Sequence, residues 1–118
     1  YTLVFRYNEK QDDLFFGHIG NHSGAMRVFG SAWAETALGR RCDRSQPDFE
    51  YDSRACAAYR DVMIRGEPVL DHVRAVIRLE GRDPIWVPYR RLVLPARDRF
   101  GAPVCEIDQN LAIPFMAA

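Results

Sequence analysis

The chain has 118 residues, enough for one domain that buries a modest core without a metal or a disulfide framework. Its 16 basic and 16 acidic residues cancel, so no net field favours nucleic acid or an anionic membrane as a partner. The apolar runs are too short to span a bilayer, and no basic-then-apolar leader is present. Because the chain begins at Tyr1 rather than methionine, we expect an excised module or a processed product of a longer protein.

The first predicted elements in chain order are two strands. Apolar and aromatic residues at 2–7 and 13–19 flank a polar segment, a pattern that predicts a β-hairpin. Asn21 is expected to cap a short helix that ends at Gly30. A second short helix follows at once and is expected to stop at Gly39.

A longer helix and three strands make up the rest of the predicted order. Asp52 or Ser53 is expected to start the helix, which carries apolar residues at helical spacing and ends at Gly66. The pattern then changes to alternation, which is typical of strands with one face in the core. Strands are predicted over 69–79, 85–95 and 104–113.

A motif in the second of these strands carries a resemblance to a known family. Residues 86–95 are Trp-Val-Pro-Tyr-Arg-Arg-Leu-Val-Leu-Pro, and 98–101 are Asp-Arg-Phe-Gly. With the turn at 65–68 (Arg-Gly-Glu-Pro), the order and spacing resemble a bacterial subfamily of PAS domains that has a W-x-x-Y-x-R-L-x-L-P strand motif.

The resemblance implies an α+β PAS fold over residues 1–118 as a single domain. That fold is a five-stranded antiparallel sheet of strand order 2-1-5-4-3 with helices on one face. The family also implies a sensory or regulatory module in bacterial signalling that acts as a homodimer or through an adjoining effector domain. Members bind haem, flavins, organic acids or fatty acids, so the resemblance fixes no ligand.

Two cofactors of the family are not favoured by the residues. The flavin-binding LOV branch has a Gly-x-Asn-Cys motif with a later glutamine; this chain keeps Gly39, Cys42 and Gln46, but Arg41 replaces the asparagine. The haem-binding branch has a histidine on the long helix, which here carries none. The three histidines, His18, His22 and His72, are expected at the surface, and the cofactor stays open.

Metal and catalytic constellations are not predicted either. No cysteines or histidines have C-x-x-C or H-x-x-x-H spacing, so no metal site is expected. The inward positions of the last three strands are expected to carry no carboxylate, and no Ser or Cys is paired with a His by motif, so we expect no enzyme. The three cysteines, Cys42, Cys56 and Cys105, are odd in number and widely spaced, which favours reduced thiols in a cytoplasm.

A pocket is predicted between the long helix and the last three strands. Tyr89 and Arg91 share a face of one strand, and a buried guanidinium requires an anion. That anion is either a ligand or a protein carboxylate such as Asp61 or Glu35; alternatively, the strand turns Arg91 to solvent. Ala75 leaves room in mid-strand. The predicted pocket residues are Tyr59, Met63, Ala75, Ile77, Tyr89, Arg91 and Ile107.

The opposite face of the same strands is also apolar. An antiparallel sheet with apolar residues on both faces favours a partner on the second face. The residues expected in a dimer interface or under an N-terminal segment are Leu70, Val76, Trp86, Leu92 and Leu94. The two other functions that the sequence leaves open are an isomerase-like or other small-molecule-binding α+β domain and a purely structural dimerisation module.

Overall fold

The predicted hairpin opens the fold in the computed structural model, which describes residues 1–44, 48–110 and 116–117. Strands β1 (Thr2–Asn8) and β2 (Asp13–Ile19) pair antiparallel, with Asn8 opposite Asp13 at the turn. The bounds of β2 are those predicted from its alternating apolar residues. The hairpin places Leu3, Phe5 and Phe16 in the core.

Two short helices follow the hairpin. Helix α1 (Gly24–Phe29) is capped by Ser23, whose hydroxyl accepts a hydrogen bond from the Met26 amide, so the cap predicted at Asn21 is wrong by two residues. Gly30, with φ of 91°, separates α1 from α2 (Ser31–Ala37). A left-handed φ of this kind favours glycine, which explains why one helix ends and another begins there.

The long helix begins one turn earlier than predicted. Helix α3 (Phe49–Arg65) is capped by Asp48, whose Oδ1 accepts a hydrogen bond from the Tyr51 amide at 3.0 Å. Asp48 is as good a cap as Asp52, and the earlier start places Asp52 inside the first turn, where it is fully buried. The helix ends as predicted at Gly66, which is left-handed with φ of 71°.

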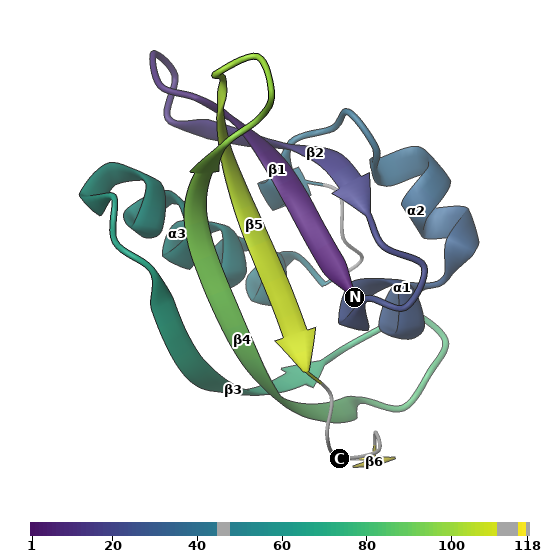
Figure 1. The fold of residues 1–118 in the computed structure, drawn as a ribbon. Coiled ribbons are helices and arrows are strands. Elements are labelled where there is room, and N and C mark those ends of the chain that lie inside the picture. The colour runs from purple at the N-terminus through teal and green to yellow at the C-terminus, as the bar shows by residue number, and fades with distance from the viewer. Residues whose placement is uncertain (45–47, 111–115, 118) are drawn as a thin grey trace.

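The remaining strands complete an antiparallel sheet of order β2-β1-β5-β4-β3, confirming the expected fold class and strand order. They are β3 (Val69–Ile77), β4 (Ile85–Arg97), β5 (Pro103–Asn110) and the short β6 (Met116–Ala117), which pairs with the start of β4. The last predicted strand included 111–113, which lie outside the described residues. The helices pack on one face of the sheet (Figure 1), an arrangement consistent with a PAS-like fold.

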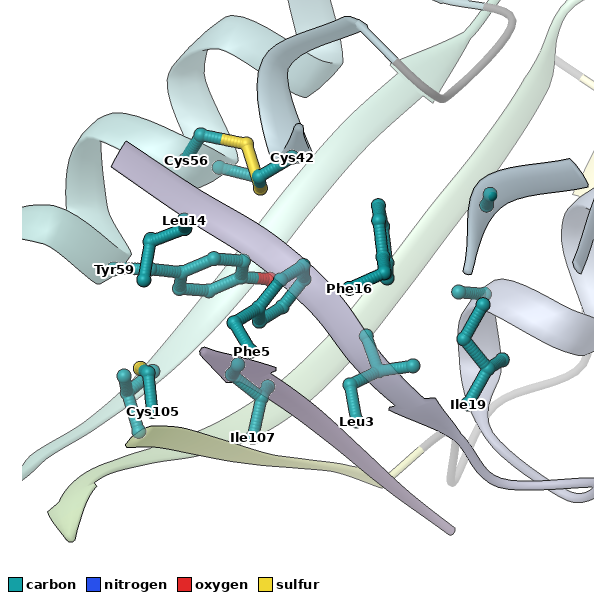
Figure 2. Close-up of a cluster of buried hydrophobic side chains, with 14 of the residues drawn as sticks. Leu3, Phe5, Leu14, Phe16, Ile19, Cys42, Cys56, Tyr59, Cys105 and Ile107 are labelled. Atoms are coloured by element: carbon teal, nitrogen blue, oxygen red, sulfur yellow. A yellow bond between two sulfur atoms is a disulfide. The ribbon is translucent and has the colours of Figure 1, made fainter. Parts of the chain in front are cut away.

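The core fills the space between the sheet and these helices. Aromatic rings dominate it: Phe5 packs on Phe16 and on Tyr59 with ring centroids 4.4 and 5.4 Å apart. Figure 2 shows these rings between the hairpin and α3, with Ile107 of β5 beneath them. Among the described residues, no helix is long and apolar enough to cross a membrane.

The cysteines depart from the prediction of three reduced thiols. Cys42 and Cys56 form a disulfide, with Cα atoms 6.0 Å apart, and Cys105 is a free, buried cysteine. The 3₁₀ helix η1 (Cys42–Arg44) returns the chain to α3, so two cysteines separated by 14 positions in sequence become neighbours (Figure 2). Spacing alone could not reveal this pairing because it depends on how η1 packs.

Candidate ligand groove between α3 and β3

A groove of about 400 Å³ lies between the N-terminal half of α3 and strand β3. Two alanines, Ala55 of α3 and Ala75 of β3, line it together with Val73. Small side chains at both walls leave space that larger residues would fill. The volume is within the range of sites that hold small molecules.

Tyr51, which lines the groove, belongs to a hydrogen-bonded pair of tyrosines. The hydroxyl oxygens of Tyr51 on α3 and Tyr89 on β4 are 2.7 Å apart and share a hydrogen bond. Burial raises the pKa of both phenols above the usual value, so both stay protonated at neutral pH. The pair is therefore neutral, and Tyr51 is its member at the groove.

Arg91 lies beside these tyrosines and is held by Asp71. Its Nε and Nη2 donate to the two carboxylate oxygens of Asp71 at 2.8 and 3.1 Å, a bidentate pair. The guanidinium also lies over the Tyr59 ring, 5.5 Å from its centroid, and the Arg91 side chain is only 11% exposed. Burial by itself lowers the pKa of Arg91. Asp71 and the neighbouring tyrosines raise the pKa by more than burial lowers it, so the net shift is upward and the guanidinium stays charged.

The partner of Arg91 is thus a strand carboxylate and not Asp61 or Glu35. Asp61 instead pairs with Arg65 one turn away at 3.2 Å. Asp71 lies directly opposite Arg91 in the β3–β4 register and has the same parity as the inward residues Val73 and Ala75. The expectation that the inward strand positions carry no carboxylate is therefore wrong, and strand alternation was the signal that could have found Asp71.

The rim of the groove is basic. Four arginines line the groove against two carboxylates, and three of these arginines, at 54, 74 and 78, are exposed. Both carboxylates are engaged: Glu50 pairs with Arg54 at 2.9 Å, and Asp48 accepts from the amides of Tyr51 and Arg78. Arg54 is thus paired with Glu50 and Arg91 with Asp71, so the positive charge available to an anion comes from the exposed arginines at 74 and 78.

The structure separates the predicted pocket residues into three groups. Ala75 and Arg91 line the groove. Tyr59 and Ile107 belong to the main core, with Met63 packed against it. Ile77 and Tyr89 belong to a smaller cluster with Val28 and Val87.

The space around that smaller cluster is only about 10 Å³, which is too small for an organic ligand. Room for a ligand therefore lies nearer the sheet edge than predicted. Sequence reasoning missed Tyr51 because it started the helix too late; Ala55 lay within the predicted helix, on the face of Tyr59, but was not included in the pocket. Counting back from Tyr59 in steps of four gives 55 and 51, which places both on the same face of α3.

The proposed interface residues gather on the outer sheet face. Leu70 pairs with Leu92, and Val76 with Trp86, across β3 and β4. Leu70 and Val76 are 68% and 42% exposed, whereas Trp86, Leu92 and Leu94 are half-buried. Val76 also lines the groove, so the groove edge and this face meet.

The remaining candidates are placed as follows. Cys42 is buried and bonded to Cys56, so in this form it has no thiol to add to a flavin ring. Gln46, the other part of that motif, lies outside the described residues. The three histidines are exposed, as expected of surface residues.

No protein-family model matches the chain, and no curated protein is similar to it in sequence. The fold and the groove are therefore the basis for a functional proposal.

Proposed function

We propose that the chain is a PAS-type sensory or regulatory module of a bacterial signalling protein that binds a small organic anion in the α3–β3 groove. The observation that carries this is the combination of an open space of about 400 Å³, the Tyr51 side chain in its lining and exposed arginines at 74 and 78 on its rim. Arginine is suited to planar carboxylates because its guanidinium donates two parallel hydrogen bonds.

The apolar walls define the other half of the ligand. Ala55, Val73 and Ala75 offer no hydrogen bonds, so the part of the ligand beside them is expected to be apolar. A short-chain or aromatic carboxylate has both features. The exposed arginines at 74 and 78 attract the charged end, and the alanines receive the apolar end.

Signal output is proposed to pass through β3. This strand contributes Ala75 to the groove and Leu70 to the outer face, and Val76 belongs to both surfaces. A ligand that changes the packing of β3 would shift the population of states in which the outer face binds a second copy or an adjoining effector domain. The proposed location is the cytoplasm, where the Cys42–Cys56 disulfide would meet reducing conditions.

A thermal-shift screen tests the proposal. The protein is heated with a panel of mono- and dicarboxylates, aromatic carboxylates and inorganic phosphate. At least one organic carboxylate is expected to raise Tm, because a ligand that binds only the folded state stabilises it. The shift is expected to be lost in Ala75→Leu, which fills the groove, and kept in Ala57→Leu, which changes an exposed alanine of α3. Equal shifts in both variants would contradict the groove as the site.

A further inference from the structure

Three potential metal ligands meet between η1 and α3, away from the groove. Cys42, Asp52 and Cys56 each offer one ligand atom, and these atoms lie within 4.8 Å of one another. All three residues are at most 1% exposed. Figure 2 shows the two sulfurs joined between η1 and α3.

The arrangement on α3 suits chelation. Asp52 and Cys56 are four residues apart, so their side chains lie on one face of the helix. The Asp52 Oδ1 is 3.6 Å from the Cys56 Sγ. Cys42 approaches from the other side on η1, and its Cα is 6.0 Å from that of Cys56.

A fully buried carboxylate beside two sulfurs is chemically suited to a soft or borderline cation. Thiolates together with one oxygen ligand are a donor set that Zn²⁺ accepts. Two Zn–S bonds of about 2.3 Å at a tetrahedral angle place the sulfurs ~3.8 Å apart, a separation that requires the bond between them to be opened.

We propose that Cys42, Asp52 and Cys56 form a zinc site when the disulfide is reduced. A dithiol reductant supplies two electrons and two protons, becomes a disulfide itself and leaves two thiols on the protein. Zn²⁺ then displaces both thiol protons and binds two thiolates and the Asp52 carboxylate, with water as the fourth ligand. A small-molecule disulfide reverses the step: it accepts two electrons from the two thiolates by thiol–disulfide exchange and leaves as two thiolates, the Cys42–Cys56 bond re-forms, and the ion is released. The site is independent of the proposed anion groove.

Cobalt replaces zinc as the probe because Co²⁺ bound by thiolates gives a charge-transfer band in the near ultraviolet, whereas Zn²⁺ is colourless. The intact chain is reduced with a phosphine, which takes oxygen from water to become its oxide, and is titrated with Co²⁺ and then with Zn²⁺. We expect one Co²⁺ per chain, the thiolate band, and displacement of Co²⁺ by Zn²⁺. The unreduced protein is expected to show no band.

Variants assign the ligands. Cys42→Ser is expected to weaken Co²⁺ binding at least tenfold and to reduce the charge-transfer band, and Asp52→Asn to weaken binding at least tenfold while keeping the band. Cys105→Ser is the matched control, because Cys105 is buried in the core but is not part of the cluster. It is expected to bind Co²⁺ as the unchanged protein does.

Alkylation checks the same assignment without mutation. Excess Zn²⁺ is expected to slow the modification of Cys42 and Cys56 by iodoacetamide in the reduced protein, as located by mass spectrometry. The proposal is overturned if the reduced protein shows no thiolate band, or if Zn²⁺ leaves the alkylation rates of both cysteines unchanged. It is also overturned if Cys105→Ser loses the band while Cys42→Ser keeps it.

Discussion

The substitution Ala75→Leu tests whether the groove is empty space that a side chain can enter. Ala75 is half-buried at the wall of the α3–β3 groove, and leucine adds three carbon atoms to it. Burial of a methylene group contributes about 0.8 kcal/mol, so complete burial of three carbons would stabilise the fold by about 2 kcal/mol. Because the groove is open to solvent, we expect roughly half of that gain.

A solid core gives the opposite sign. Extra carbons in a well-packed interior typically cost about 1–3 kcal/mol, because side chains and backbone must shift. Ala37 of α2 provides that comparison: it is 1% exposed in the main core, so Ala37→Leu is expected to destabilise the protein by about that amount. The two substitutions add the same atoms at positions that differ in the space around them.

Urea denaturation followed by tryptophan fluorescence measures both variants against the unchanged protein. The expected result is a free energy of unfolding that is unchanged or higher in Ala75→Leu and clearly lower in Ala37→Leu. A loss of about 1 kcal/mol or more in Ala75→Leu would show that this wall is closely packed. In that case the space between α3 and β3 could not accept a ligand without rearrangement, and the reasoning would be refuted.

Three further predictions concern the interface, the buried ion pair and the free cysteine. Leu94→Glu places a charge on the outer sheet face and is expected to convert a dimer to monomers in light scattering. The control Ile64→Glu changes a residue of α3 that is 65% exposed and is expected to leave the mass unchanged. A dimer that persists in Leu94→Glu argues against this interface. Asp71→Asn removes the bidentate partner of the Arg91 side chain, which is 11% exposed, so we expect the free energy of unfolding to fall by about 2 kcal/mol. This is below the roughly 3–5 kcal/mol of a fully buried pair because Asp71 is 36% exposed. No measurable loss in urea denaturation would contradict this prediction. Burial, followed by the charge of Glu106, raises the pKa of the Cys105 thiol from 9.0 to about 12, so the folded state keeps its proton while the unfolded state loses it above pH 9. The resulting stability is fully present below pH 9 and is lost as the pH rises towards 12. Between pH 8 and 10 we expect the free energy of unfolding to fall by about 1 kcal/mol, and we expect no such fall in Cys105→Ala. Equal losses in the two proteins would refute the pKa shift.

The sheet could be predicted from local pattern because its signals lie close together in the sequence. The alternating apolar residues of β2 predicted its bounds correctly, and polar turns indicated where the strands separate. Glycines with left-handed φ at 30 and 66 ended two helices where expected. The strand order itself came from the resemblance to PAS domains, since no local pattern states which strands are neighbours.

The start of α3 and the disulfide show where local pattern fails. Asp48 and Asp52 are both acceptable caps, and the choice depends on tertiary contacts: Asp48 also accepts from the Arg78 amide of the distant β3–β4 segment at 2.7 Å. The Cys42–Cys56 pairing likewise depends on how η1 packs against α3. Neither contact is encoded in the spacing of residues.

The candidate site was predicted only in part, because it too depends on how facing elements pack. Alternation correctly indicated that Ala75 and Arg91 share a side of the sheet, and both line the groove. It could not indicate that Tyr59 and Ile107 are buried in the main core and not along the groove, because packing of facing elements decides this. The basic rim was missed because the arginines at 74 and 78 have outward parity, yet they lie at the sheet edge beside the groove.

The central claim, a small organic anion bound between α3 and β3, is tested most directly by amide chemical shifts of the ¹⁵N-labelled protein. The spectrum is recorded with and without each carboxylate of the thermal-shift panel, at saturating concentration. The largest changes are predicted at the amides of Tyr51, Ala55, Val73 and Ala75, which border the groove. Changes confined to the outer sheet face around Leu92, or no changes with any carboxylate, would contradict the claim.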